Sequence, residues 1–341
     1  MSLLDKLKSV GIAKTSTLNE SIIFNDKDMI QTEIPIINVA LSGKLDGGMT
    51  SGLSIIAGES KRFKSLLGLL QMKAYLKKYP EAVALFYDTE FGVTPEYVTA
   101  MGIPAERVVH IPIEDIEQLK FDIAKKMEAI VRGDRVFVFI DSIGLLASKK
   151  EAEDALAGKD AQDMTRQKQL KVVFRIITPH FTTKDICGVI IAHTYKTMEM
   201  YAKDVVSGGQ AVMLAANNVW IIGKSQEKDA DGIKGWNFTI NVEKSRFVKE
   251  KSKLSFLVTY DGGFAKYSGL MDEALESGAC FKPSNGWYSK KGEEKKYRFD
   301  DTNNKEFWAS ILADVEFQEF IKNKYQLSHR SLFNDADFGE E

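Results

Sequence analysis

One loop in the sequence has the residue types and the spacing that bind phosphate groups. Residues 53–57 are apolar and predict a short strand, and residues 66–78 form an amphipathic run that predicts a helix. The loop between them holds Gly58, Glu59, Ser60, Lys61, Arg62, Phe63, Lys64 and Ser65. Its glycine and its Lys-Ser pair fit the spacing G-x-x-x-x-G-K-[ST], in which backbone N–H groups at a helix start point at an anion. Phe63 replaces the second glycine, which normally supplies backbone freedom, so an ordinary strand–turn–helix corner stays open as an alternative.

Two carboxylates follow predicted strands and could complete a nucleotide site. Asp141 ends the apolar run 136–140, where a carboxylate helps to hold Mg²⁺ together with a loop hydroxyl such as that of Ser65. The structural alternative is that Asp141 caps a helix, as Asp often does after a strand. Glu90 follows the run 83–87 and could polarise a water molecule for attack on a γ-phosphate. Taken alone, Glu90 would be an ordinary residue of a solvated loop.

The elements that must position these residues alternate along the chain. Apolar runs predict strands at 53–57, 83–87, 136–140, 188–192 and 219–222. Segments with helical periodicity lie between most of them, at 64–78, 116–132 and 161–178. Buried strands that alternate with helices predict an α/β fold with a mainly parallel sheet covered by helices on both faces. Two alternating runs, 238–243 and 253–260, predict an antiparallel pair at one edge of the sheet.

The remaining segments divide the chain into three parts. Residues 1–31 are expected to form a short amphipathic helix and a linker, which contact either their own domain or a neighbouring subunit. Residues 32–267 form the core, and residues 268–341 form a small C-terminal lobe with a closing helix near 303–325. The last residues, 334–341, are mostly polar and acidic, and we expect them to lack a fixed structure.

Composition limits the kind of partner that the chain can have. The 341 residues carry a net charge of −2, so any contact with nucleic acid must come from a local group of Lys and Arg side chains. No apolar run approaches the roughly eighteen residues of a membrane span, and the two cysteines are far apart in the sequence. We therefore expect a protein of a reducing cytoplasm.

Two segments are poor candidates for the core and could bind nucleic acid instead. The first is charged, begins at residue 149 and leads into a helix whose basic side chains could line a groove for backbone phosphates. These side chains are Arg166, Lys168, Lys171 and Arg175. In the second, residues 194–209, apolar groups could wedge against bases, and glycines would let phosphates approach the backbone. Its candidates are Lys196, Met198, Gly208 and Gly209, with Tyr195, Met200 and Tyr201 as further apolar groups. A helix surface followed by a flexible loop would give the same pattern.

Several short motifs resemble those of the RecA recombinases, in the same order along the chain. Residues 88–97 are similar to the RecA pattern of a catalytic glutamate followed by an adenine-stacking tyrosine. His193 ends an apolar strand in the place of the RecA sensor glutamine, and residues 207–209 resemble the Gly-Gly at the far end of the second DNA loop. Residues 242–246 resemble the Lys-x-Lys that reaches a neighbour's ATP, and residues 286–289 resemble a turn of the C-terminal lobe.

The resemblance covers residues 32–325 and is strongest to the phage UvsX branch of the family. In that branch an aromatic residue in the phosphate-binding loop and a histidine in place of the glutamine also occur. Phe63 and His193 thus depart from RecA in a way that a subfamily shares. Phe63 must then turn its side chain away from the phosphates while its N–H stays in the loop.

The resemblance implies how the loop and the carboxylates would act on ATP. The loop from Gly58 to Ser65 would wrap the phosphates, with Lys64 on the β- and γ-phosphates. Ser65 would bind Mg²⁺ directly, and Asp141 would bind it through water. Glu90 would activate the attacking water.

The resemblance also implies contacts with adenine, with a neighbouring subunit and with DNA. Tyr97 would stack on adenine, and Tyr260 would lie near the base or the ribose. Lys244 and Arg246 would act on the γ-phosphate of the adjacent subunit, although such a pair can also be a solvated strand edge. His193 would sense the γ-phosphate and signal to the DNA loop; a histidine at such a strand end is often a hydrogen-bonded core residue.

The expected function is ATP-dependent exchange of DNA strands by a helical filament on single-stranded DNA. The chain would be a DNA-dependent ATPase with ATP and Mg²⁺ as cofactors, acting in homologous recombination and DNA repair. Its partners would be single- and double-stranded DNA and further copies of itself, with single-strand-binding and loader proteins as additional candidates in the host bacterial cytoplasm. Two alternatives stay open at this point: a ring-forming helicase on the same fold, and a filament protein that binds single strands without hydrolysing ATP.

Overall fold

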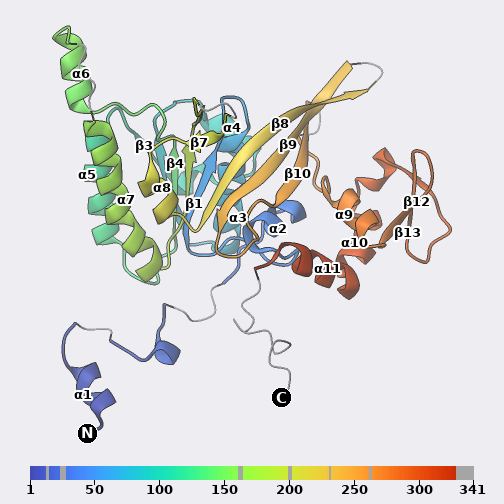
Figure 1. The fold of residues 1–341 in the computed structure, drawn as a ribbon, viewed down its shortest axis with the longest axis horizontal. Coiled ribbons are helices and arrows are strands. Elements are labelled where there is room, and N and C mark those ends of the chain that lie inside the picture. Colours follow the sequence, from blue (N-terminus) through green and yellow to red (C-terminus); the bar gives the residue numbers. More distant parts are fainter. Residues whose placement is uncertain are drawn as a thin grey trace, which may run out of the picture.

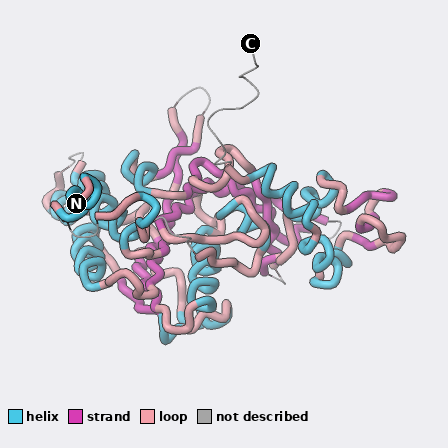
Figure 2. The backbone as a smooth tube through the Cα atoms, turned by 90° about the horizontal axis from the view of Figure 1, so that it is seen from below, coloured by secondary structure: helices cyan, strands magenta, loops and turns pink. Residues whose placement is uncertain are grey.

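A computed structural model describes residues 1–12, 15–23, 28–159, 164–198, 202–229, 232–260 and 263–327. Figure 1 shows a central sheet with helices on both faces, a long β-hairpin that projects beyond the sheet, and a smaller lobe at one end. Figure 2 shows the same chain from below, with the lobe set apart from the helices that cover the sheet.

The central sheet has nine strands in the order β11-β10-β9-β8-β1-β5-β4-β2-β3. Its strands are β1 (Gly52–Ala57), β2 (Val83–Asp88), β3 (Val108–Pro112), β4 (Val136–Asp141), β5 (Cys187–Ala192), β8 (Asn218–Asp229), β9 (Gly232–Ser245), β10 (Lys253–Thr259) and β11 (Gly263–Phe264). The strands from β8 to β3 pair in parallel, and β9, β10 and β11 continue the sheet in antiparallel pairs. The predicted α/β fold, its five buried strands and its antiparallel edge are therefore confirmed.

Helices on opposite faces bury alternate residues of the same strands. One face is covered by α2 (Pro35–Ser42) and α3 (Lys64–Lys78), and the other by α5 (Ile116–Ala129), α7 (Thr165–Thr183) and α8 (Gln210–Ala215). Within β1, Ile56 packs toward the first face, while Leu53 and Ile55 pack toward the second. This alternation is the period of two that a strand requires, and it explains why both faces of β1 are apolar.

Two of the predicted helices differ from the observed ones at their ends. The backbone leaves the helical conformation at Ile130, so α5 ends three residues before the predicted 132. The helix predicted to end at 178 continues through Pro179 to Thr183. Pro179 reads as a stop signal, but α7 continues because Phe181 is buried in the core, and its burial outweighs the lost backbone bond.

Several short elements lie outside the sheet and its covering helices. They are α4 (Pro95–Ala100), α6 (Lys149–Leu156), the hairpin of β6 (Thr194–Lys196) with β7 (Asp204–Val206), and 3₁₀ turns at Leu18–Glu20, Ala105–Arg107 and Asp300–Thr302. No residue of α6 is buried, and this helix projects from the body in Figure 1.

The C-terminal lobe combines three helices with a small sheet. It contains α9 (Leu270–Glu276), β12 (Cys280–Ser284), β13 (Trp287–Lys290), β14 (Tyr297–Arg298), α10 (Lys305–Ala313) and α11 (Val315–Tyr325). The predicted closing helix is in fact two helices, because the Asp314 carboxylate accepts the Glu316 N–H at 2.9 Å and caps a new one. Trp308 and Phe317 belong to the same apolar cluster as α2 and α3, so the lobe shares the core of the main body. The predicted acidic tail, 334–341, lies outside the described residues.

The N-terminal helix α1 (Leu3–Ser9) forms as predicted but buries none of its residues. The side chains of Leu3, Leu7 and Val10 are 72%, 60% and 66% exposed, so the helix is not folded back onto its own domain. A contact between α1 and a neighbouring subunit stays a prediction. None of the helices in the described part of the chain could span a membrane.

Candidate nucleotide site and nucleic-acid groove

The loop from Gly58 to Phe63 joins the end of β1 to the start of α3 in an unusual backbone conformation. Gly58 has φ 156°, and a Cβ atom there would lie 3.1 Å from the carbonyl oxygen of Ile222. Lys61 and Phe63 have φ values of 58° and 55°, in the left-handed region that costs about 1–2 kcal/mol for residues with a side chain. The loop therefore has the shape that glycine usually supplies, but it reaches that shape with Phe63.

The side chain of Phe63 has a partner outside the loop. Its ring lies 4.9 Å from that of Phe238 in β9, which in turn stacks on Phe256 of β10. Phe63 is 37% exposed, whereas Phe238 is fully buried. This packing stabilises the left-handed residue and directs its ring toward β9, which supports the expectation made for Phe63.

Lys64 begins α3 and is nearly buried. Its Nζ donates to the carbonyl oxygen of Glu59 at 2.7 Å, which closes the loop on itself. Burial lowers the pKa of Lys64, and the charges of Glu90 and Asp141 oppose that shift. Arg62 turns the other way and pairs with the Glu59 carboxylate. The ammonium group of Lys64 is thus held close to both predicted carboxylates.

Asp141 lies in register with Asp88 at the ends of the paired strands β4 and β2. Burial raises the pKa of Asp141 to about 6, while a hydrogen bond with Ser65 acts in the opposite direction. Its Oδ1 atom has no hydrogen-bond partner among the described residues. A buried, unpartnered carboxylate oxygen beside a hydroxyl fits a hard cation such as Mg²⁺, which prefers oxygen ligands.

Glu90 accepts two hydrogen-bond contacts on one oxygen. The Ser142 hydroxyl donates to Oε1 at 2.6 Å, and Nε2 of His193 lies 3.1 Å from the same atom. The contact with His193, followed by that with Ser142, lowers the pKa of Glu90 to about 2, although burial acts against it. Thr89 supports Ser142, since its Oγ1 donates to the Ser142 carbonyl oxygen and accepts the Ser142 N–H.

His193 joins Glu90 to the second predicted DNA loop. Its ring touches Glu90, while its carbonyl oxygen accepts the Ser207 N–H at 2.8 Å and its N–H donates to Ser207 Oγ. Ser207 precedes Gly208 and Gly209, whose φ values are 99° and 77°. A change at the Glu90 carboxylate can therefore reach these glycines through the His193 side chain and the two hydrogen bonds between His193 and Ser207.

The structure does not bring Lys244 and Arg246 to the loop of their own chain. In the sheet register Lys244 lies opposite Val219, which lies beside Ile55 in the middle of β1. Along β9, Lys244 is six residues from Phe238, whose ring contacts Phe63 of the phosphate-binding loop. Lys244 donates to the Met213 carbonyl oxygen at 2.6 Å, and burial lowers its pKa. Arg246 is exposed. The Arg246 N–H donates to the Asn217 carbonyl oxygen, and the Asn217 N–H donates to that of Leu53 near the start of β1. Along β9, both cations therefore lie away from the loop, toward the opposite end of the sheet.

The two predicted adenine contacts are accessible aromatic side chains. Tyr97 lies in α4 and is 42% exposed. Tyr260 follows β10, and its hydroxyl accepts a hydrogen bond from Trp236 Nε1 at 2.8 Å. Lys224 stands 3.5 Å from the centre of the Trp236 ring, so a cation–π contact lies beside Tyr260.

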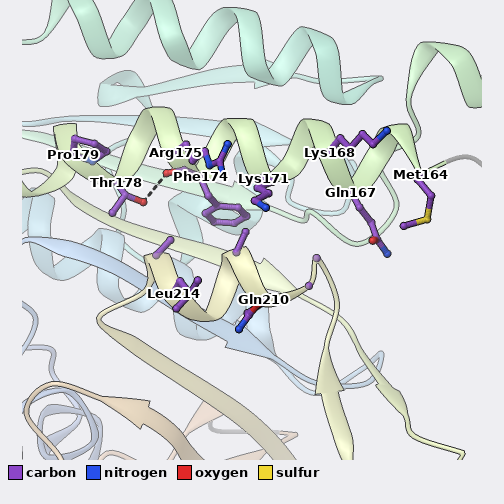
Figure 3. A pocket seen from close by; sticks show the side chains of 14 residues that line it. Met164, Gln167, Lys168, Lys171, Phe174, Arg175, Thr178, Pro179, Gln210 and Leu214 are labelled. Carbon is purple, nitrogen blue, oxygen red and sulfur yellow. Dashed lines mark hydrogen bonds between the residues drawn. The ribbon is translucent and has the colours of Figure 1, made fainter.

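Most of the predicted DNA-binding residues line one open cavity of about 670 Å³ between α7 and α8. Figure 3 shows side chains of the two helices facing each other across it. The predicted residues in its lining are Lys168, Lys171, Arg175, Gly208 and Gly209. Phe174 and Leu214 give it an apolar wall. We call this cavity the α7–α8 groove.

Three other predicted DNA contacts have different surroundings. Arg166 donates from Nε and Nη2 to the carbonyl oxygens of residues 143, 144 and 146, so these donors are not free for phosphate as predicted. Lys196 pairs with Asp204 at 2.7 Å across the β6–β7 hairpin. Met198 is fully exposed, and Met200 and Tyr201 lie outside the described residues.

Sequence reasoning missed Ser142, Thr89 and Trp236 as parts of the site. Ser142 directly follows the strand that ends at Asp141, so its position was a usable signal. Trp236 could not be placed, because its proximity to Lys224 depends on the register of β8 with β9.

The known proteins that this chain resembles include a phage recombination and repair protein and bacterial RecA proteins. Residues 267–321 match the family model for the C-terminal domain of the bacteriophage T4 recombination and repair protein. That T4 protein is 50% identical over 323 residues, which cover 92% of this chain and 83% of the T4 protein. Protein RecA of Syntrophobacter fumaroxidans is 27% identical over 76% of each chain. Protein RecA of Francisella philomiragia is 24% identical over 84% of this chain and 78% of its own length.

Proposed function

This chain belongs to the RecA-related family of the phage T4 recombination and repair protein, and we propose that it exchanges DNA strands as an ATP-driven filament. Membership in that family makes it a recombination protein and a DNA-dependent ATPase. The same relationship favours this function over a ring-forming helicase and over a filament protein that does not hydrolyse ATP. What remains to be proposed is how particular residues carry out each step.

ATP would bind where β1, β2 and β4 end. The loop from Gly58 would surround the phosphates, and Lys64 would exchange the Glu59 carbonyl oxygen for phosphate oxygens. Ser65 and the unpartnered Oδ1 of Asp141 would hold Mg²⁺, which neutralises charge on the phosphates when bound. Tyr97 and Tyr260 would contact the adenosine part.

Hydrolysis would depend on Glu90 orienting the attacking water. The depressed pKa of Glu90 keeps the carboxylate ionised at neutral pH, as a hydrogen-bond acceptor for water must be. In the structure its Oε1 is held by Ser142 and His193, so water must either displace one of these contacts or use Oε2. The contact between His193 and Glu90 would thereby depend on whether the glutamate binds the attacking water.

The γ-phosphate would receive Lys244 and Arg246 from the adjacent subunit. Their place toward the opposite end of the sheet supports this, because a chain that stacks head-to-tail presents that end to its neighbour's loop. Such a heterologous contact, if its rotation does not close, produces an open helical filament. Cations supplied from the neighbour stabilise charge that develops during phosphoryl transfer.

Single-stranded DNA would lie in the α7–α8 groove, with Lys168, Lys171 and Arg175 on its phosphates. Gly208 and Gly209 border both the groove and the Ser207–His193 contact, which supports a link between nucleotide state and DNA binding. Contacts of this kind are largely independent of sequence.

One observation carries the proposal: the Glu90 carboxylate joins the nucleotide site to the DNA loop through His193. The test is ATP hydrolysis with and without single-stranded DNA, followed by strand exchange between homologous DNAs. We expect DNA-stimulated hydrolysis that is lost in Lys64→Ala and Glu90→Gln, while the surface variant Glu319→Gln behaves as the unchanged chain.

Two results would contradict it. Hydrolysis that persists in both Lys64→Ala and Glu90→Gln would exclude these residues from the nucleotide site. Closed rings on DNA in electron micrographs with a non-hydrolysable ATP analogue, together with directional unwinding of a fork, would favour the helicase.

A further inference from the structure

Arg166, at the start of α7, binds the turn formed by residues 142–146, which follows β4. Its Nε donates to the carbonyl oxygen of Leu146 at 2.6 Å, and its Nη2 donates to those of Ile143 and Gly144 at 2.8 and 2.7 Å. Hydrogen bonds from a charged donor are stronger than those between neutral groups, and the planar guanidinium makes all three at once. A lysine ammonium is a compact donor on a flexible stem and does not reproduce this geometry.

The turn that Arg166 holds also carries the support of the catalytic carboxylate. Gly144 accepts from Arg166 through its carbonyl oxygen and donates its N–H to Ser142 Oγ at 3.2 Å. Ser142 is fully buried, and the same hydroxyl donates to Glu90 Oε1 at 2.6 Å. Three consecutive contacts therefore join the guanidinium to the glutamate.

The second partner of Glu90 packs on the same turn. A Cβ atom on Gly144 would lie 2.0 Å from Cδ2 of His193, so the turn and the imidazole ring fit closely only because residue 144 is glycine. A displacement of the turn would therefore disturb both groups that contact Oε1 of Glu90.

Arg166 also lies on the helix that lines the groove. Lys168 and Lys171 follow it by two and five positions in α7, and both line the α7–α8 groove in Figure 3. The first two turns of α7 thus line the groove with their lysines and bind the 142–146 turn through Arg166. This connection uses the segment after β4, whereas the one through Ser207 uses the segment after β5.

We propose that Arg166 is a positioning residue: through the 142–146 turn it holds Glu90 in place and so couples an occupied groove to hydrolysis. The inference rests on the proposed roles of Glu90 and of the groove. Arg166 therefore acts on the rate of hydrolysis, whereas the neighbouring lysines act on DNA affinity.

The test compares Arg166→Lys, which keeps the positive charge, with Lys168→Gln, which removes one from the groove. A displacement of reacting groups by about 1 Å costs up to about 100-fold in rate, so kcat of the DNA-stimulated reaction should fall roughly 10–100-fold in Arg166→Lys. The KM for ATP, the affinity for single-stranded DNA and its salt dependence should stay as in the unchanged chain. Lys168→Gln should show weaker DNA binding and a shallower salt dependence, with kcat recovering as DNA is raised.

A double-variant cycle decides whether Arg166 acts through the turn. If it does, the kcat losses of Arg166→Lys and Ser142→Ala should combine to less than their product, because both remove the same support. Losses that multiply, or a Ser142→Ala variant with unchanged kcat, would overturn the proposal. So would weaker DNA binding with a shallower salt dependence in Arg166→Lys, which would make Arg166 a phosphate contact.

Ser142→Ala also serves if Arg166→Lys does not fold, since it removes the same support of Glu90 while leaving the guanidinium in place. The result separates this inference from the proposed function. If the unchanged chain hydrolyses ATP with DNA but the variants do not show the expected pattern, only the role of Arg166 is refuted. An unchanged chain with no DNA-stimulated hydrolysis refutes both.

Discussion

The two ends of the central sheet are built differently, although both carry residues of one proposed reaction. Where β1, β2, β4 and β5 end, Lys64 and Asp141 are buried and His193 is half-buried. Glu90 is more exposed, but hydrogen bonds tie it, Lys64 and His193 to neighbours in the same chain. Toward the opposite end, Arg246 is exposed, and Lys244 is anchored only to a backbone carbonyl among the described residues. We call these the closed end and the open end.

The difference indicates that a single chain holds two incomplete sites. The closed end holds Lys64 and the carboxylates of Glu90 and Asp141, and the arginine of its loop, Arg62, is paired with Glu59. The open end has the cations but no phosphate-binding loop. Stacking two chains head-to-tail would bring a closed end against an open end, so hydrolysis would require assembly.

The largest expected effect tests whether the ends work on different chains. Arg246→Ala should lower DNA-stimulated hydrolysis by about 10³-fold, because a cation supplied in trans contributes that much to phosphoryl transfer. Mixing it with Glu90→Gln should restore part of the rate, since one kind of interface in the mixture pairs an intact closed end with an intact open end. Rates are measured across mixing ratios. No recovery at any ratio would mean that each chain completes its own site.

The second effect concerns the buried charge at the closed end. Burial raises the pKa of Asp141 from 3.8 to about 6, and about 1.36 kcal/mol per unit makes this about 3 kcal/mol. Because the folded-state pKa is the higher one, this stability is full below about pH 3.8 and is lost as the pH rises through about 6. In EDTA, Asp141→Asn should therefore raise the free energy of unfolding at pH 8 by up to about 3 kcal/mol.

Chemical denaturation of both proteins between about pH 4 and pH 8 checks the sign. The gain should disappear toward the acid limit, where the Asp141 carboxyl is protonated in the folded chain. Mg²⁺ with ATP should remove the advantage at pH 8, because the cation neutralises the aspartate. A gain that is independent of pH would show that the carboxylate is not the source.

The third effect concerns the α7–α8 groove, which is an open cavity lined by Lys168 and Lys171. Replacing Lys168 and Lys171 by Gln should weaken single-stranded DNA binding by roughly 10-fold and reduce the slope of log K against log salt by about 1.4. Lys196→Gln is the matched control, since Asp204 already pairs with that ammonium and its loss should cost less. Fluorescence anisotropy over a salt series measures both quantities. An unchanged slope would exclude the two lysines from the groove contacts.

The smallest effect concerns the left-handed residue of the loop. Phe63→Gly and Phe63→Ala both remove the contact with Phe238, but only glycine adopts a φ of 55° without cost. Phe63→Gly should therefore be the more stable variant by about 1 kcal/mol in urea unfolding. Equal stabilities would show that the loop relaxes once the ring is gone.

Much of the architecture was predictable, because buried parallel strands read as short apolar runs between helical segments. β3 was missed, since Val108–Pro112 contains a histidine and a proline and none of its residues is fully buried. The helical segment was predicted to end at 178, just before Pro179, whereas α7 continues to Thr183, because the burial of Phe181 acts only in the folded chain.

The site was predictable in its residues and less so in their contacts. Motif spacing identified Glu90 and His193, but their 3.1 Å contact requires that β2 and β5, which are distant in sequence, lie on either side of β4. Arg166 was assigned to DNA by its charge, since sequence does not show where the carbonyl oxygens of residues 143–146 point. The partner of Phe63 depended on the register of β9, which no local pattern specifies.

Strand β9 connects the two ends in one further respect. Near its middle, Phe238 packs on the loop residue Phe63, and near its end stands Lys244, which is six residues away. At about 3.3 Å per residue these positions are separated by roughly 20 Å of nearly inextensible backbone. In the proposed filament, β9 would therefore fix the distance between the loop of one chain and the cations that the same chain offers to its neighbour, and a shift of the loop would move those cations with it.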